Sequence, residues 1–300
     1  MTTTPPTSGP DLAASLPVFP DATGAPLSVI TASALRSRRI ATWRQEHPLV
    51  RWGLWGVFVL GCILAATRSI GGIALVIGVI VIWMLLYSKQ SKEASNELFA
   101  AYAEPRGLHA TGETPGIGFP ELPLLTRGDE QEINRSVSGS ISGTTGVIAH
   151  YTYTVITVDS EGNSQRNDYP HTVILLKLHP TVADRFRGVF LSSRSILSGR
   201  LFDAFTAYRH IELESAEFER RYTLRVDDQQ DDIALYELMN PPFIQHLVEA
   251  PRIDNNVVEF EQRGEHLLVH VETHLSDSTT LDDLVMASAQ IYRRYSQEYQ

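Results

Sequence analysis

The chain has 300 residues, of which 43% are hydrophobic and 20% are charged, and its formal net charge is −10. Residues 1–96 contain eight Lys/Arg and four Asp/Glu, which leaves 17 Lys/Arg and 31 Asp/Glu for residues 97–300. The acidic part should be repelled by nucleic acid and by anionic lipid, whereas the basic part suits a membrane surface. The single cysteine, Cys62, excludes an intrachain disulfide.

The chain begins with two segments that are not expected to belong to a folded domain. Residues 1–30 are rich in Pro, Thr, Ser and Ala without periodicity, which predicts a disordered tail. Residues 31–51 form a basic juxtamembrane segment. Within it, residues 31–46 fit a basic amphipathic helix that lies along the interface, and they fit a disordered positive flank equally well.

Two apolar runs follow, at residues 52–67 and 69–88, and Arg68 alone separates them. A bilayer core of about 30 Å needs about 20 helical residues, which the second run supplies. The first run reaches only about 24 Å on its own, so Arg51 and Arg68 must extend their charged ends to the headgroups. The pattern predicts a two-span transmembrane hairpin over residues 52–88, in contact with the lipid bilayer through residues 50–88. A buried helical hairpin of a soluble protein is the alternative.

The positive charges around the hairpin predict its orientation. Only Arg68 lies in the connection, while seven basic residues flank the pair: Arg36, Arg38, Arg39, Arg44, Arg51, Lys89 and Lys92. Because cytosolic flanks carry the excess of Lys and Arg, both termini are expected in the cytosol. Neither run contains Asp, Glu, Lys, Arg or His, so the spans indicate an anchor and weaken the hypothesis of a transport accessory subunit.

After the hairpin, residues 89–102 favour a helix with Leu98, Phe99 and Tyr102 on one side, and Pro105 and Gly107 end it. Residues 89–106 are therefore predicted as a helical stem, and residues 107–300 as a cytosolic domain. Strand patterns cover residues 133–142, 146–158, 169–178, 188–193, 211–213, 221–226, 257–262 and 266–273. Helical patterns cover residues 215–219, 228–238, 241–249 and 280–295. The predicted fold class is α+β, an N-terminal transmembrane helical hairpin followed by a mostly antiparallel β-sheet with short helices and a C-terminal helix.

Three histidines, His266, His270 and His274, are spaced by four residues, which on a helix would suggest a metal site. Their neighbours alternate in the manner of a strand, where four residues span about 13 Å, too far for one ion. We therefore expect an exposed strand face and no metal site.

The remaining polar clusters nominate no chemistry. Asp227, Asp228, Asp231 and Asp232 lack the glycine and distal Glu of an EF-hand loop, so helix capping is favoured over calcium binding. The Ser-rich residues 136–143 lack the nucleophile-elbow pattern because Ile141 stands at its centre. The sequence has no Walker A, GxGxxG, HExxH or CxxC motif. No catalytic residue is nominated, and no cofactor or metal is predicted.

One part of the domain resembles a known family. Residues 217–271 are similar to the C-terminal part of a bacterial membrane-protein family without an assigned activity. The shared pattern has a Phe-Glu-x-x-Phe/Tyr start, an Asp-Asp-Gln step, a Pro-x-Phe-Ile/Met helix opening and a closing hairpin. Its positions here are Phe218, Glu219, Tyr222, Asp227, Asp228, Gln229, Pro241, Phe243 and Ile244. The resemblance implies a two-span hairpin ahead of a cytosolic domain in the bacterial cytoplasmic membrane.

These observations favour a membrane-anchored interaction or regulatory module with a protein partner and without nucleic acid. The alternative is a membrane-tethered enzyme, hydrolase-like, whose active site is too dispersed to see in the sequence. A deep polar pocket with converging His, Asp or Glu would favour the enzyme, and a shallow surface with an apolar patch would favour the interaction module.

Overall fold

A computed structural model describes residues 31–35, 37–38, 57, 59, 62, 70–112, 122–194 and 208–297. The predictions of a disordered tail over residues 1–30 and of a first membrane span lie outside these residues, apart from the helical positions Val57, Val59 and Cys62. The second apolar run begins a 34-residue helix, α3 (Ile70–Ala103), which also includes most of the predicted stem. Within the described residues, no helix is found to be long and apolar enough to cross a membrane.

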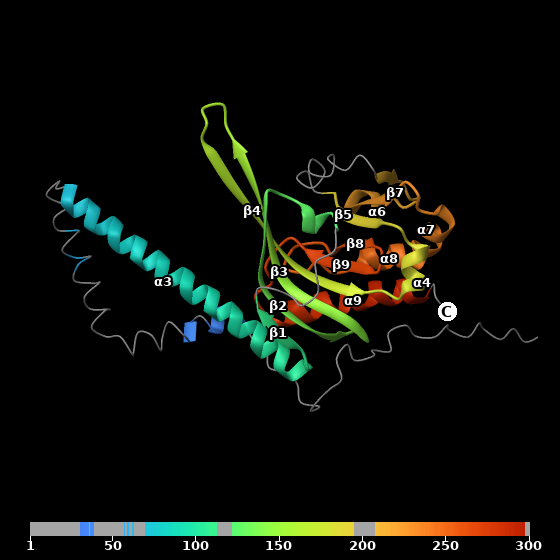
Figure 1. The fold of residues 1–300 in the computed structure, drawn as a ribbon, viewed down its shortest axis with the longest axis horizontal. Helices are drawn as coiled ribbons and strands as arrows, with labels where there is room; N and C mark the ends of the chain where they lie inside the picture. The colour runs from blue at the N-terminus through green and yellow to red at the C-terminus, as the bar shows by residue number, and fades with distance from the viewer. Residues whose placement is uncertain are drawn as a thin grey trace, which may run out of the picture.

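The domain is built on one antiparallel sheet of nine strands in the order β1-β2-β3-β4-β9-β8-β5-β7-β6 (Figure 1). This confirms the α+β fold class and the antiparallel sheet. The strands are β1 (His109–Gly112), β2 (Glu130–Ile141), β3 (Thr144–Val158), β4 (Ser164–Lys177), β5 (Val189–Ser193), β6 (Tyr208–Ile211), β7 (Tyr222–Asp227), β8 (Glu259–Arg263) and β9 (His266–Val271).

The long strands form where β-branched and aromatic residues accumulate. β3 pairs with β4 over most of its length, from Gly146 opposite Leu176 to Val158 opposite Ser164. β2 joins β3 through a two-residue turn, Ser142 and Gly143, both of which have positive φ. Such turns match the twist of the flanking strands and need residues that tolerate a left-handed backbone.

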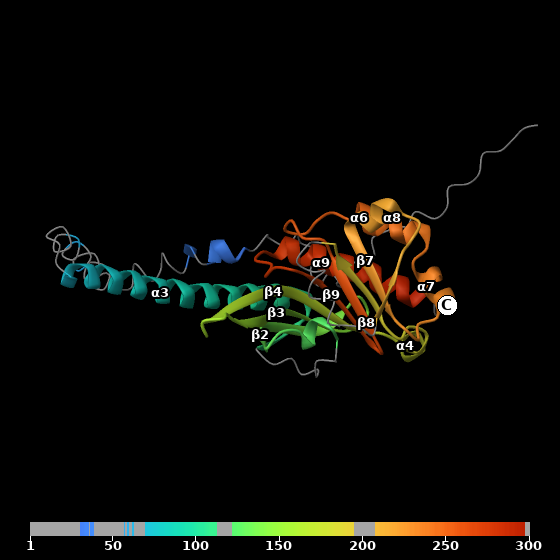
Figure 2. The same ribbon diagram turned by 90° about the horizontal axis from the view of Figure 1, so that it is seen from above.

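Helices cover one face of the sheet (Figure 2). They are α4 (Pro180–Arg185), α6 (Ala216–Arg221), α7 (Asp232–Leu238), α8 (Pro241–Glu249) and α9 (Ser278–Gln297), with the 3-10 helix η1 (Glu104–Arg106). The 3-10 helix η2 (Leu124–Thr126) lies on the opposite face. The main core joins α9, through Leu281, Leu284 and Val285, to the sheet side chains Phe260 and Val269. Sequence patterns missed β1 and α4, since four or six residues are too few to show a period.

A second, smaller core lies on the opposite face of the sheet. It joins Leu122, Leu124 and Leu125 to alternate side chains of the central strands, including Tyr151 and Leu268. Residues 122–127 therefore cover part of a face that would otherwise meet water. Because both faces are covered, polar side chains on the second face are forced into buried positions.

The stem is tied to the last helix by a buried arginine. Arg106, whose side chain is 4% exposed, donates from Nε and Nη2 to the two carboxylate oxygens of Asp282, at 3.1 and 2.6 Å. The Tyr102 hydroxyl donates to the same carboxylate at 2.8 Å. Leu98, Phe99 and Tyr102 are all buried, so the C-terminal end of α3 packs on the domain while its N-terminal half projects away (Figures 1 and 2).

Replacing Asp282 by Ala should lower the free energy of unfolding of the full chain by about 2–3 kcal/mol, because it leaves a buried guanidinium without its carboxylate. Urea unfolding in detergent measures the change. Asp283→Ala is the matched control on the same helix turn, and it should cost less than about 0.5 kcal/mol. Equal losses in the two variants would contradict a structural role for the Arg106–Asp282 pair.

Candidate functional site

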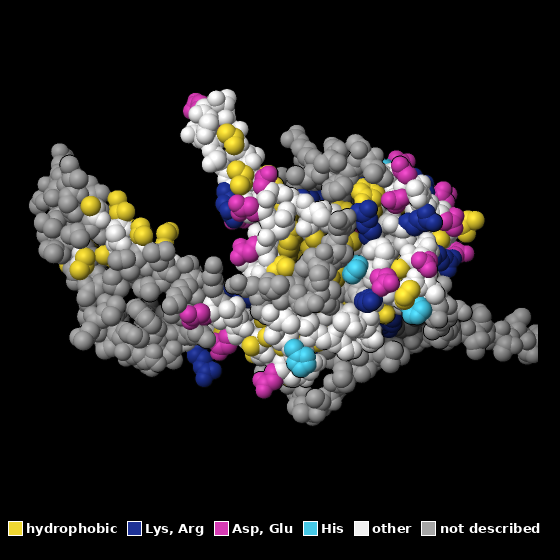
Figure 3. All heavy atoms as spheres, in the orientation of Figure 1, with side chains coloured by type: hydrophobic (Ala, Val, Ile, Leu, Met, Phe, Trp, Pro, Cys, Tyr) yellow, Lys and Arg dark blue, Asp and Glu magenta, His cyan; other side chains and the backbone are white. Residues whose placement is uncertain are grey.

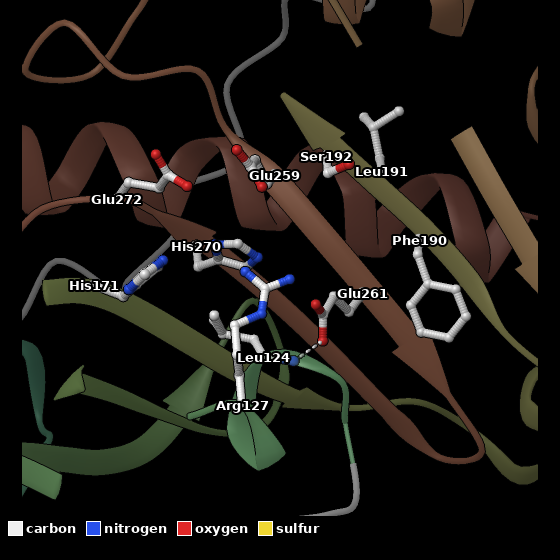
Figure 4. A pocket seen from close by; sticks show the side chains of 10 residues that line it. All are labelled: Leu124, Arg127, His171, Phe190, Leu191, Ser192, Glu259, Glu261, His270 and Glu272. Atoms are coloured by element: carbon white, nitrogen blue, oxygen red, sulfur yellow. Dashed lines mark hydrogen bonds between the residues drawn. The ribbon is translucent and has the colours of Figure 1, made fainter. Parts of the chain in front are cut away.

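A small polar pocket lies on the second face of the sheet, beside residues 122–127. Its lining residues come from five separated parts of the chain: Leu124, Arg127, His171, Phe190, Leu191, Ser192, Glu259, Glu261, His270 and Glu272 (Figure 4). The enclosed space is about 10 Å³, which is room for about one water molecule. The pocket therefore excludes a large ligand in this conformation.

Strand alternation brings these side chains together. On β8, Phe260 points into the main core, so its neighbours Glu259 and Glu261 point to the second face. On β9, His270 stands directly opposite Glu259 in the ladder, and His171 follows on β4. Three adjacent strands thus place acids and imidazoles side by side, in positions that are buried from solvent.

The two glutamates of β8 are buried, at 4% and 2% exposure. Burial raises the pKa of Glu259 to about 8, with the neighbouring Glu272 adding to the shift. Burial also raises the pKa of Glu261 to about 7, although the Leu124 N–H and the Arg127 charge act in the opposite direction. The pKa of Glu272 is raised by burial as well. At neutral pH the site therefore holds protons on carboxyl groups.

The two histidines of the pocket are kept neutral. Burial lowers the pKa of His171 to about 4 and lowers the pKa of His270 well below its ordinary value. Their rings lie 5.5 Å apart, so each charge would also oppose the other. Nδ1 of His270 is buried and has no hydrogen-bond partner among the described residues.

Arg127 is the cation of the site, and it comes from the segment that covers the pocket. Figure 4 shows its guanidinium between His270 and Glu261. Its positive charge lowers the pKa values of Glu259, Glu261 and Glu272, and it lies 5.5 Å from the centre of the Tyr153 ring. The Leu124 N–H donates to Oε2 of Glu261 at 3.0 Å, and the Tyr151 hydroxyl donates to the Leu124 carbonyl at 3.1 Å.

This arrangement suits proton exchange near neutral pH, since two carboxyl groups titrate there beside neutral imidazoles. Among the lining residues Ser192 offers the only hydroxyl. No three His, Cys, Asp or Glu side chains within the described part of the chain are grouped so that they would hold a metal ion.

The prediction that His266, His270 and His274 lie on an exposed strand face was wrong. His270 is 3% exposed and lines the pocket, and His266 and His274 are half-buried, so the three do not form an exposed strand face. His274 lies beyond the end of β9, and its ring stacks on that of His150 at 4.4 Å. The error arose because the second face of the sheet was taken to be in contact with solvent.

The prediction for the aspartate cluster is confirmed at Asp231, whose side chain accepts the N–H groups of Ile233 and Ala234 and begins α7. Asp227 accepts the Gln229 N–H at 2.9 Å, and Asp232 pairs with Arg209. The Ser-rich residues 136–143 form the end of β2 and its turn, away from the pocket.

Sequence reasoning missed Glu259, Glu261, His171 and Arg127. The one available signal was the order Val-Val-Glu-Phe-Glu-Gln at residues 257–262, in which acids alternate with apolar residues. That pattern is also typical of a strand with one solvent-exposed face. Among the described residues, residues 122–127, which are distant in sequence, cover this face.

Comparison with known proteins adds no relative: no family model, no curated protein and no solved structure matches the chain.

The raised carboxyl pKa values predict an alkaline loss of stability. A carboxyl whose pKa is raised in the folded state stabilises below its unfolded pKa, and that contribution is lost as pH rises towards 7 and 8. The free energy of unfolding should therefore fall between pH 6.5 and 8 with a slope of up to about 1.4 kcal/mol per pH unit per carboxyl. Glu259→Gln should flatten this slope, whereas Glu265→Gln, on the surface of the β8–β9 turn, should not. Parallel slopes in the wild type and Glu259→Gln would contradict the buried-acid interpretation.

Proposed function

We propose that the protein is a membrane-anchored interaction or regulatory module of the bacterial cytoplasmic membrane, with both termini and the α+β domain in the cytosol. It binds a protein partner through a projecting β-hairpin. The apolar runs at residues 52–67 and 69–88 are its anchor. The exposed side chains of Ile77, Ile80, Val81 and Met84 on the projecting half of α3 are consistent with a lipid environment (Figure 3).

A contact made by the segment before the anchor supports the two-span topology. Thr31 forms a β-bridge with Asp277, and the Ala32 N–H donates to the Ser276 carbonyl at 2.7 Å. Ala32 is buried, and Leu35 packs on the main core. In the proposed topology residues 31–35 and the domain lie on one side of the membrane, and this contact between them supports an even number of crossings by the apolar chain.

The observation that carries the interaction role is the hairpin of β3 and β4. The pairing of β2 with β3 ends at Glu130 opposite Thr154, and β9 begins to pair with β4 only at Thr172. Between these points the two strands pair with each other alone in the described part of the chain, and the arm projects from the body (Figures 1 and 3). We call residues 155–170 the hairpin arm.

The arm is held in place at its base, has a polar tip at residues 159–163, and exposes two apolar side chains between them. Arg166 bonds to Glu130 at 2.7 Å and to Asp168 at 3.1 Å, and the Asp129 carboxylate accepts the Ile156 N–H at 2.7 Å. Ile156 and Val158 are 38% and 66% exposed on one face of the arm. An ordered arm with open strand edges and exposed β-branched residues suits strand addition by a partner.

A tethered enzyme is the second candidate, and the polar pocket is the observation that favours it. The pocket brings together acids and histidines as an acid–base site would. We rank it second because the space holds about one water molecule and because Ser192, the only hydroxyl among the lining residues, makes no hydrogen bond to a histidine within the described part of the chain. The hairpin arm, by contrast, packs on the second core through Val155 and Tyr169 at its base, and the rest of it projects from the described part of the domain.

The topology predicts a disulfide between Thr31→Cys and Asp277→Cys, introduced together with Cys62→Ser. Residues that face each other in an antiparallel bridge have the Cα separation that a disulfide requires. In isolated membranes treated with a mild oxidant, the pair should shift in non-reducing gels. Thr31→Cys with Gln290→Cys is the matched control, because Gln290 lies about 20 Å further along α9. Absence of the cross-link between Thr31→Cys and Asp277→Cys would contradict the proposal that residues 31–35 and the domain lie on the same side of the membrane.

The interaction role predicts that the arm is required for partner binding. Affinity capture from native membranes should yield a stoichiometric partner with the wild type. That partner should be lost when residues 157–165 are replaced by an Asn-Gly turn, which shortens the arm and keeps Ile156 opposite Arg166 in the β3–β4 register. Ile233→Ser serves as the control, since it removes an apolar side chain that is 70% exposed on α7. Capture of the same protein by the shortened variant would contradict the role of the arm.

A further inference from the structure

The acidic pocket carries more carboxyl groups than positive charges. Among the described residues that line it, the two buried carboxyl groups, Glu259 and Glu261, face a single guanidinium, that of Arg127, while Glu272 is exposed at the edge of the pocket. If both buried groups ionised, one negative charge would remain without a partner in a space that water scarcely enters. A buried charge without a partner costs several kcal/mol, so the excess charge must be neutralised.

Protons are the neutralising cations that this geometry accepts. No group of side chains in the described part of the chain is arranged for a metal ion, and the two histidines are held neutral. The groups that face Glu261 are Arg127, Tyr151, Tyr208, Glu259, His270 and Glu272. Of these only Arg127 would be positively charged at neutral pH.

The same pocket fastens a separate piece of the chain to the sheet. Residues 122–127, which we call the latch, lie between β1 and β2 in the chain. They cover the second face of the sheet over its central strands. The latch is attached by the Leu124 N–H bond to Glu261, by the Tyr151 bond to the Leu124 carbonyl, and by the Arg127 side chain. One of these attachments, the Leu124 bond, is therefore made to a carboxyl group that can ionise, that of Glu261.

We propose that the pocket is a proton-controlled latch: protonated Glu259 and Glu261 keep residues 122–127 docked on the sheet, and their ionisation releases the segment. When the carboxyl O–H bonds break, the protons pass to solvent and two carboxylates are left under the latch. Hydration of these carboxylates requires the covering segment to move away.

The direction follows from the difference between the docked and released states. In the docked state burial raises the pKa values of Glu259 and Glu261 to about 8 and about 7, whereas hydrated carboxyls return to an ordinary value near 4.5. Protons therefore bind the docked state more tightly, and docking is lost as pH rises through this range. The Arg127 charge and the Leu124 N–H oppose release, but burial outweighs them.

Hydrogen exchange of the Leu124 amide tests the latch directly, since this N–H is bonded to Glu261. In the full chain in detergent, its protection factor, corrected for intrinsic exchange, should fall at least about tenfold from pH 6 to pH 9. The amides of α9 should stay protected, which shows that the opening is local. Glu265→Gln is expected to behave as the wild type.

The variant Glu259→Gln/Glu261→Gln should show protection that does not change over the same range, because each amide keeps an acceptor oxygen and cannot ionise. Unchanged protection in the wild type, a pH dependence that survives in the double variant, or loss of α9 protection in parallel would each overturn the proposal. So would reversal of the release by millimolar Mg²⁺ or Zn²⁺, which would make a metal ion the controlling cation. If the double variant does not fold, the wild-type comparison of Leu124 with α9 still decides.

Discussion

The covering of the sheet on both faces is the constraint on which the rest of the structure depends. Helices and the end of α3 close one face, and residues 122–127 close part of the other. The side chains of a central strand are then buried on whichever face they lie. Phe260 points into the main core, and its neighbours Glu259 and Glu261 are buried on the opposite face. The energetic cost of that burial is expressed as raised carboxyl pKa values, since protonation is the cheapest way to remove a buried charge.

The elements with long or strongly periodic patterns could be predicted from the sequence. The strand at residues 146–158 and the helix over Pro241–Glu249 form where their side-chain patterns place them. The strand predicted at residues 169–178 is also present, but it begins earlier, at Ser164. Their positions depend on local rules of alternation, capping and turn chemistry. The short elements β1 and α4 depend instead on partners brought by the fold: β1 gains its place by pairing with β2, and α4 by burying Val182.

The site could not be predicted in the same way, because its character depends on contacts between distant segments. Leu124 and Glu261 are separated by 137 positions in the chain, and only their hydrogen bond shows that the glutamate is covered. His270 reads as a solvent-facing residue from its strand alone, yet it is 3% exposed once residues 122–127 and β4 are in place. A pattern within one strand gives the face on which a residue lies and leaves open what covers that face.

The hairpin arm and the pocket share strand β4, and β3 of the arm contacts Arg127 of the pocket, which gives a physical route between them. Tyr153 of β3, stacked on Tyr169 of β4 at 4.8 Å, lies at the root of the arm. The same Tyr153 ring lies beneath Arg127, and His171 of β4 lines the pocket. Release of the latch would take the guanidinium off the Tyr153 ring and open the second face at the point where the arm leaves the sheet. Coupling between distant sites requires an element with two arrangements that both sites favour differently, and residues 122–127 are placed to be that element.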